Sequence, residues 1–139
     1  MKKKIILVLG DPNSINSEII FKCWNKLSKS IRKRIYLIAN YNLILQQFKK
    51  LNYFTDCILV KNIYDKQSSD QLKIINIDLK FNKPFSISKK NSSQFVLNSL
   101  LLAHKIALDE SVAGVINCAI NKSLLSKRNI GVTEFLANK

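Results

Sequence analysis

The sequence opens with an apolar run, a turn and an apolar helical pattern, and the repetition of this unit constrains the fold most. Residues 5–9 are apolar at every position and mostly β-branched, which is typical of a strand covered on both faces, as in a parallel sheet. Residues 10–14 have turn chemistry. Apolar residues then recur at helical spacing from 19 to 27, and we expect Ser14 or Asn16 to cap that helix.

The same unit occurs a second time and is followed by a third strand. The pattern predicts a strand over 34–39, a helix over 43–51 and a strand over 57–60. The connections are too long for hairpins, so we expect parallel strands with right-handed crossovers. Residues 94–110 form the most strongly helical segment, and we expect it to be mostly buried. The predicted fold class is therefore α/β, with a parallel, doubly wound sheet and flanking helices.

Residues 61–92 differ in character from the rest of the chain. Polar residues dominate them, apart from a short apolar pattern between 74 and 79. We expect a surface excursion that carries one extra strand, within a single α/β unit over residues 1–139.

The charge of the chain invites a nucleic-acid hypothesis that its composition weakens. The formal net charge is +14, but only three of the 23 basic residues are Arg. Base and phosphate recognition favours the planar fork of Arg, and the Lys clusters are not interleaved with aromatic residues. We therefore do not expect nucleic-acid binding to be the main function.

The cysteines and the apolar runs indicate a cellular compartment. Three cysteines without a CxxC spacing predict neither a disulfide framework nor a zinc site, and they favour a reducing environment. No apolar run approaches the roughly 20 residues needed to span a bilayer. We expect a cytoplasmic protein that does not enter a membrane.

Motifs for common catalytic sites are absent from the sequence. The only histidine, His104, has no Asp or Glu at three or four residues on either side, which favours a structural role. No Ser/His/Asp triad, metal-ligand cluster or GxGxxG fingerprint occurs.

Polar side chains are concentrated between residues 113 and 137. The apolar run 114–118 leads into Asn121 and Lys122, and a second polar cluster follows at 131–134. Ligands of open α/β sheets bind beyond the carboxyl ends of the strands. We therefore expect both clusters at the edge of the sheet where a site would form.

Three segments, taken together, carry a family resemblance. Residues 10–18 read Gly-Asp-Pro-Asn-Ser-Ile-Asn-Ser-Glu, residues 115–122 read Val-Ile-Asn-Cys-Ala-Ile-Asn-Lys, and residues 131–137 read Gly-Val-Thr-Glu-Phe-Leu-Ala. In the same order, they resemble the Gly-Asp-Pro-Ala-Gly-Ile-Gly-Pro-Glu, Val-Val-Thr-Ala-Pro-Ile-Asn-Lys and Gly-His-Thr-Glu-Phe-Leu-Ala of the 4-hydroxythreonine-4-phosphate dehydrogenases. The similarity covers essentially the whole chain.

The resemblance implies an oxidoreductase with a fold like that of the isocitrate and isopropylmalate dehydrogenases. Such an enzyme is a homodimer that uses NAD or NADP and a divalent metal (Zn, Mg or Co) in pyridoxal phosphate (vitamin B6) biosynthesis. It oxidises and decarboxylates a small phosphorylated substrate, 4-hydroxythreonine 4-phosphate.

Matching positions give the candidate substrate-binding residues. Thr133 matches the third motif most securely, and Lys122 and Asn121 stand at the family's Asn-Lys positions, where a cation suits an anionic substrate. Asp11 is the acidic residue of the first loop. Val132 occupies the position of the family's substrate-contacting histidine and can form no hydrogen bond through its side chain.

Several departures separate the chain from the family. Ser14 and Asn16 replace glycines, and Ser17 and Ala119 replace prolines. Members of the family are also much longer, and their metal-ligating histidines and most of their cofactor contacts lie beyond the third motif. We therefore expect the chain to be the amino-terminal half of such an enzyme, either a fragment of a longer product or a degenerate, truncated copy. We expect it to be inactive alone and to bind neither metal nor cofactor alone.

Two alternatives stay open. The first is a non-catalytic half-domain that binds an anion or a partner chain. The second, which we favour less, is a basic nucleic-acid-binding module.

Overall fold

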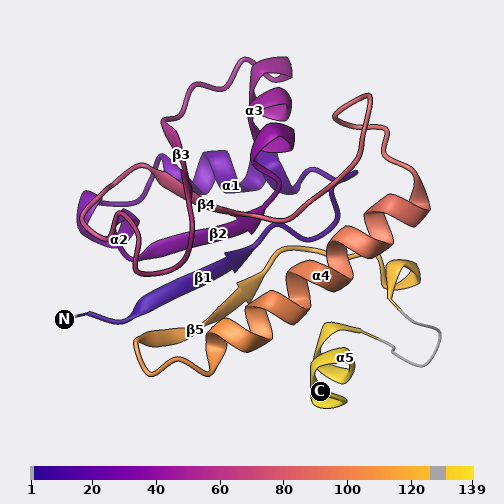
Figure 1. Cartoon of the computed structure of the whole chain (residues 1–139). Coiled ribbons are helices and arrows are strands. Elements are labelled where there is room, and N and C mark those ends of the chain that lie inside the picture. Colours follow the sequence, from indigo (N-terminus) through magenta and orange to yellow (C-terminus); the bar gives the residue numbers. More distant parts are fainter. Residues whose placement is uncertain (1, 126–130) are drawn as a thin grey trace.

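Five parallel strands form one sheet in the order β3-β4-β2-β1-β5 (Figure 1). The computed structural model describes residues 2–125 and 131–139. The strands are β1 (Lys4–Val8), β2 (Ile35–Ala39), β3 (Cys57–Val60), β4 (Leu72–Asn76) and β5 (Val112–Asn117). The helices are α1 (Asn16–Trp24), α2 (Lys29–Arg32), α3 (Tyr41–Lys50), α4 (Lys89–Ala107) and α5 (Val132–Ala137), and a single 3₁₀ turn, η1, spans Lys122–Leu124. The predicted parallel α/β sheet with flanking helices is confirmed.

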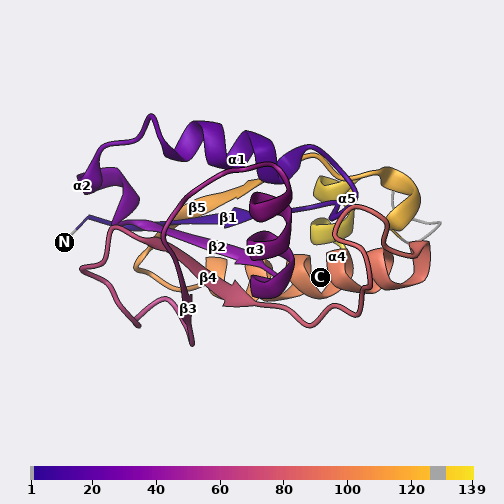
Figure 2. The ribbon, with the colours of Figure 1, turned by 90° about the horizontal axis from the view of Figure 1, so that it is seen from above.

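Helices cover the two faces of the sheet unequally. The connections through α1 and α3 advance toward the same edge of the sheet, so right-handed crossovers place both helices on one face, where they contact each other. The chain returns from β4 to β5 in the opposite direction, and α4 therefore lies on the other face against β1, β2 and β5. Figure 2 shows α1 and α4 on opposite sides of the sheet.

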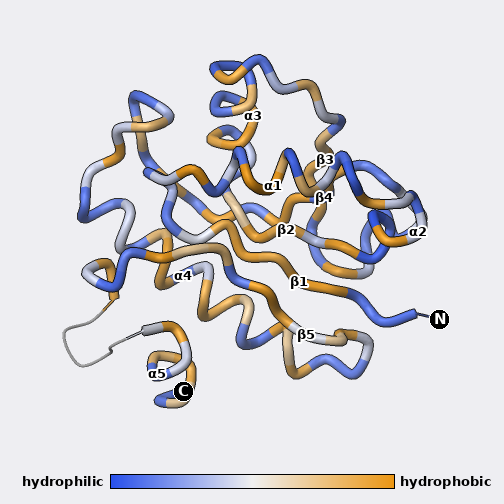
Figure 3. The backbone as a smooth tube through the Cα atoms, turned by 180° about the vertical axis from the view of Figure 1, so that it is seen from behind, coloured by the Kyte–Doolittle hydropathy of each residue, from blue (hydrophilic) through white to orange (hydrophobic). Residues whose placement is uncertain are grey.

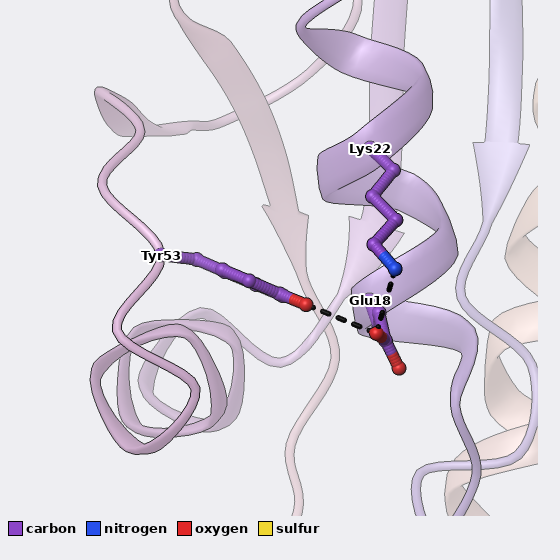
Figure 4. A network of polar contacts seen from close by, with 3 residues as sticks. All are labelled: Glu18, Lys22 and Tyr53. Carbon is purple, nitrogen blue, oxygen red and sulfur yellow. Dashed lines mark hydrogen bonds and ion pairs between the residues drawn. The ribbon is translucent and has the colours of Figure 1, made fainter.

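Aromatic and polar contacts hold α1 against the end of α3. The ring of Phe21 stacks on that of Tyr53, with centroids 4.1 Å apart and planes 2° from parallel. The Tyr53 hydroxyl donates a hydrogen bond to Glu18 (3.0 Å), which also pairs with Lys22 at 2.9 Å (Figure 4). These two hydrogen bonds lower the pKa of Glu18. The contacts fix which side of α1 faces α3.

The strand expected inside the 61–92 excursion is an interior strand, not an addition at the surface. β4 lies between β3 and β2, and its first four residues are buried. Its one polar residue in that stretch, Lys73, is fully buried and donates hydrogen bonds to the carbonyls of Lys33 (2.7 Å) and Ser69 (3.0 Å). Because these two hydrogen bonds satisfy the buried Lys73 ammonium, β4 can lie in the interior of the sheet.

Two helices differ from the sequence prediction. The N-cap residue of α1 is Ile15, which makes no side-chain cap, and neither Ser14 nor Asn16 caps the helix in the expected way. α4 begins five residues earlier than predicted because the Ser88 hydroxyl accepts a hydrogen bond from the Asn91 amide. Only one face of α4 is buried, since Leu101 is 42% exposed.

β1 is not covered on both faces, contrary to the prediction from its apolar run. Ile6 and Val8 are fully buried on the α4 face, whereas Ile5 and Leu7 on the other face are only half-buried. The neighbouring strand β5 is more open, with Ile116 57% exposed. Figure 3, from behind, shows hydrophobic chain along β1 and much of β5.

None of the helices within the described residues has the length and apolar character required to cross a membrane.

Candidate functional site

The candidate site lies where β1 and β5 end side by side. The loop after β1 leads to α1 on one face of the sheet, whereas the chain after β5 leads to η1 and α5, which contact α4 on the other face. Adjacent parallel strands whose continuations diverge in this way form a crevice at their carboxyl ends, which is the usual ligand position in open α/β sheets. The sequence analysis predicted a site at this edge of the sheet.

Gly10 allows the two loops to meet. Its φ is +78°, and a Cβ at this position would lie 2.7 Å from the carbonyl oxygen of Ala119 and 2.9 Å from that of Cys118. Both the backbone conformation and the close approach require glycine. The Asp11 amide then donates to the Ala119 carbonyl at 3.3 Å.

The side chain of Asn16 links the loop after β1 to the loop after β5. Its side-chain Nδ2 donates to the carbonyls of Leu9 (2.9 Å) and Ala119 (2.7 Å), and the residue is 1% exposed. Asn16 Oδ1 and Ser17 Oγ are also buried, but they have no hydrogen-bond partner among the residues the structure describes. From the sequence, Asn16 is only a candidate helix cap or a replacement for a family glycine. A polar residue at a family glycine was the signal that could have indicated this contact.

Hydrogen bonds to other parts of the chain also hold the first loop, which is the loop after β1. Asn13 donates to the Ile87 carbonyl (2.7 Å) and accepts from the Ile87 amide (2.8 Å). The buried Gln47 amide group of α3 donates to the carbonyls of Pro12 (2.8 Å) and Pro84 (2.6 Å). The loop is therefore preorganised by groups that the sequence did not single out.

Asp11 shapes the first loop with its own side chain. Its carboxylate accepts a hydrogen bond from the Asn13 amide at 2.9 Å, and its carbonyl accepts one from the Ser14 hydroxyl at 2.7 Å. The residue is half-buried. The Asp11 carboxylate thus makes a hydrogen bond within its own loop.

Asn121 and Lys122 lie at the start of η1, and both are exposed. The Asn121 carbonyl oxygen of the side chain accepts from the Ser123 amide at 3.1 Å, which caps the turn. The Ser93 hydroxyl of α4 donates to the Leu124 carbonyl at 2.5 Å and anchors η1. This leaves the Lys122 ammonium on the surface.

The second polar cluster begins α5 and approaches Lys122. A Cβ built on Gly131 would lie 4.0 Å from Lys122 Cε and 3.1 Å from a carboxylate oxygen of Glu134. Thr133 is exposed, while Val132 is half-buried and packs against the hydrophobic core. The structure thus brings Lys122 next to the Gly131 turn. The remainder of the expected loop, residues 126–130, lies outside the described residues.

The predicted site residues offer polar groups that suit ligand binding. Burial, with a smaller contribution from Cys23, raises the pKa of the Cys118 thiol to about 11, so it stays protonated at neutral pH and is no nucleophile. In the described part of the chain, no three His, Cys, Asp or Glu residues are grouped to hold a metal ion. The predicted residues can therefore bind and orient a ligand.

A cavity lies elsewhere, near the loop between α3 and β3. It has a volume of about 550 Å³, and Phe54 and Asp56 are among its lining residues. It contains none of the predicted site residues. We place the candidate site at the carboxyl edge of the sheet because the loop geometry there is fixed by buried hydrogen bonds.

Known proteins resemble the chain in both sequence and fold, although no protein-family model matches it. The chain is 29% identical over 140 residues to the 4-hydroxythreonine-4-phosphate dehydrogenase of Sulfurihydrogenibium sp. (strain YO3AOP1), a match that covers 96% of the chain. Its fold is similar to crystal structures of 4-hydroxythreonine-4-phosphate dehydrogenases from Klebsiella pneumoniae and Burkholderia phymatum. The first gives a TM-score of 0.72 at 18% identity over 88% of this chain, and the second 0.80 at 16% identity over 99%.

The relatives are longer than this chain. The match spans 42% of the Sulfurihydrogenibium protein, 39% of the Klebsiella chain and 43% of the Burkholderia chain. The structural likeness covers the five-stranded parallel sheet and its helices. The chain is therefore similar to a partial region, about 40% in length, of 4-hydroxythreonine-4-phosphate dehydrogenases, and it shares the fold of that region.

Proposed function

We propose that this chain supplies part of the substrate-binding surface of a two-domain 4-hydroxythreonine-4-phosphate dehydrogenase, of which it is the amino-terminal part. The complete enzyme, a homodimer, carries out the NAD(P)-dependent oxidation and decarboxylation of 4-hydroxythreonine 4-phosphate. Turnover requires the region of the family protein that this chain does not span.

The observation that carries the proposal is the fixed meeting of the two loops beyond β1 and β5. Gly10 and Asn16 hold the first loop on the Ala119 carbonyl, two residues before Asn121 and Lys122. The buried polar atoms of Asn16 and Ser17 that lack partners in the described residues further support a polar ligand or water at this edge.

Each candidate residue has a role that fits this substrate. The Lys122 ammonium pairs with the phosphate or carboxylate of the substrate, and the Thr133 hydroxyl donates a hydrogen bond to the same anion. The Asn121 side chain caps η1 and thereby positions Lys122. Asp11 faces a cationic or hydroxyl group of the substrate. Val132 is used in core packing and offers no polar contact.

The described residues of this chain do not fit the family's metal and cofactor sites. The described residues hold no cluster of metal ligands, and the only histidine, His104, lies on α4. The loop after β1 has Ser14 and Asn16 where the family resemblance would place glycines. We therefore assign no chemical step to a metal or nicotinamide held by these residues. We propose that the remaining region of the family protein binds both the metal and the nicotinamide.

Substitution of Lys122 tests the proposal. We expect Lys122→Ala to weaken binding of 4-hydroxythreonine 4-phosphate roughly tenfold, because a charge-assisted hydrogen bond is worth about 1.5–3 kcal/mol. Binding to the 139-residue chain is measured by calorimetry or by shifts of amide resonances in NMR titration.

Lys50→Ala is the matched control, because Lys50 is an exposed lysine at the end of α3. It should bind the substrate like the unmodified chain. Equal weakening by both substitutions would show that only the overall positive charge matters, and the assignment of Lys122 would then be wrong.

A further inference from the structure

Two runs of basic residues that are distant in the sequence meet at the amino ends of the strands. Residues 2–4 lead into β1, and residues 32–34 lead into β2. Because β1 and β2 pair in parallel, their starts lie side by side. The Ile5 amide donates to the Arg34 carbonyl at 2.9 Å, and Arg34 Nε donates to the Lys3 carbonyl at 2.7 Å. Figure 1 shows this end of the sheet beside α2 and the amino terminus.

A cavity of about 320 Å³ lies between these two runs and the loop before β4. Four of its lining residues are cations, namely Lys2, Lys4, Lys33 and Arg34, and the other three are two serines and a glutamine. Among the described residues no carboxylate lines the cavity, so every lining side chain can donate a hydrogen bond. The volume falls in the range of about 300–1,000 Å³ that small-molecule sites occupy.

The cations of the cavity are not neutralised by ion pairs. In the part of the chain that the structure describes, none of the four lies within ion-pair distance of a carboxylate. Lys2 and Lys33 are exposed. Arg34 uses its Nε for the Lys3 carbonyl, and the two terminal amino groups of its guanidinium can still donate to a ligand. Because like charges that lie close together repel one another, a bound anion would stabilise the cavity.

A buried lysine holds two walls of the cavity in place. One wall is Lys33, in the turn before β2, and the other is formed by Gln67 and Ser68, in the loop before β4. The buried Lys73 ammonium donates to the carbonyls of Lys33 (2.7 Å) and of Ser69 (3.0 Å), the next residue of that loop. The cavity is therefore preorganised, which reduces the entropy that binding costs.

Lys4 contributes positive charge from a buried position. It is 6% exposed, and its ammonium donates to the Ser111 hydroxyl at 3.3 Å and lies 4.3 Å from the centre of the Tyr64 ring. Burial lowers the pKa of Lys73 to about 8, Asp70 opposes this shift, and the charge of Lys4 adds to it. The positive potential thus extends beneath the exposed cations of the cavity.

We propose that this cavity binds the polyphosphate chain of a small molecule, whose oxygens accept hydrogen bonds from Lys2, Lys33 and Arg34. Ionised phosphate oxygens are acceptors, and they match a lining made of donors. The cavity has room for about ten waters at roughly 30 Å³ each, which is more than a single phosphate fills. A di- or triphosphate can contact cations of both basic runs at once. Inorganic polyphosphate and nucleoside triphosphates share this group.

The cavity is separate from the candidate site. Lys4 begins β1, whereas Gly10 follows its end, so the two residues lie about 20 Å apart at about 3.3 Å per residue. Binding of a polyphosphate here is independent of the function proposed for the carboxyl edge of the sheet.

Titration calorimetry of the 139-residue chain with inorganic tripolyphosphate tests the proposal at about 0.1 M salt. We expect saturable 1:1 binding that is at least about tenfold tighter than binding of orthophosphate, because the longer anion makes more charge-assisted hydrogen bonds. Lys33→Ala should weaken binding at least about fivefold. The substitution should leave the fold intact, since the Lys33 side chain is exposed and Lys73 contacts only its carbonyl.

Lys26→Ala is the matched control, because Lys26 is an exposed lysine outside the cavity. It should bind tripolyphosphate like the unmodified chain. Amide resonances of Ser30, Gln67 and Ser68 should shift on titration in NMR spectra. Lys122→Ala should bind tripolyphosphate normally, which separates this cavity from the proposed substrate site.

ATP is the second probe, and it distinguishes the two sources of the phosphate chain. Equal affinity for ATP and tripolyphosphate would support recognition of the chain alone, and tighter binding of ATP would support a nucleoside triphosphate. Three results would each overturn the proposal: orthophosphate binding as tight as that of tripolyphosphate, equal weakening by Lys33→Ala and Lys26→Ala, or loss of binding in Lys122→Ala.

Discussion

Gly10 is the residue on which the geometry of the candidate site depends most directly. We expect Gly10→Ala to lower the free energy of unfolding by about 2–4 kcal/mol, because the side chain would be strained at φ +78° and would clash with two carbonyl oxygens. Denaturant unfolding followed by circular dichroism measures the change.

Gly114→Ala is the control for the effect of a methyl group alone. Gly114 lies in β5, and no atom stands within 4 Å of the added Cβ. We expect a change within about 0.5–1 kcal/mol, with a small gain from reduced freedom of the unfolded chain. Similar losses for both alanine variants would show that close approach of the two loops is unimportant.

Lys73 makes the stability of the fold depend on pH. Burial lowers the pKa of its ammonium from 10.5 to about 8, with Asp70 opposing the shift and Lys4 adding to it. Between pH 8 and 10.5 the unfolded chain therefore binds more protons at this residue than the folded chain. The contribution of Lys73 to stability rises with pH across that window, by on the order of 1 kcal/mol.

Comparison with Lys73→Met isolates this contribution. Burial raises the pKa of Cys57 and Cys118 to about 11, which lowers stability at high pH, but this effect is common to both proteins and cancels in the difference. From pH 7 to 10 the parent should gain stability relative to Lys73→Met. The exposed-site variant Lys90→Met should show no such trend. A constant difference at all pH values would contradict the prediction.

At the scale of elements, hydrophobic patterning predicted the strands well but not the interior position of β4. β3 matches its predicted range, and β2 begins one residue later than expected. β4 was expected at the surface because its flanking segments are polar, yet it pairs with β3 and β2. Pairing in a parallel sheet depends on partners distant in sequence, and a single buried lysine such as Lys73 obscures the apolar pattern of the strand.

The sequence selects an edge of the sheet and particular residues for the candidate site, and this stays a prediction, whereas the scaffold that holds these residues could not be predicted. The rule that ligands bind at the carboxyl ends of parallel strands located it, and the family motifs selected Lys122 and Thr133. The contacts of Asn16 and Gln47 depend on carbonyl groups from distant loops. Which carbonyls approach one another is set by tertiary structure, so local sequence carries no signal for these bonds.

At the scale of the whole molecule, a group of basic residues lies away from the candidate site. Lys2, Lys4, Lys33 and Arg34 line a cavity of about 320 Å³ near the amino ends of β1 and β2. Arg34 already donates to the Lys3 carbonyl at 2.7 Å. Arg32 likewise donates to the Trp24 carbonyl at 3.1 Å. The arginines in the described residues thus hold backbone groups of the fold, and the other basic side chains of that part of the chain, His104 aside, are lysines.

This distribution predicts only non-specific attraction to nucleic acid. Lysines act as point charges toward phosphate and do not read bases, so the chain should bind two DNA duplexes of unrelated sequence with equal affinity. That affinity should fall at least about 100-fold between 50 and 200 mM salt, because binding is driven by counterion release. Fluorescence anisotropy measures both properties. A tenfold preference for one sequence, or binding that persists at high salt, would instead favour the nucleic-acid module over the dehydrogenase half-domain, because charge alone produces neither.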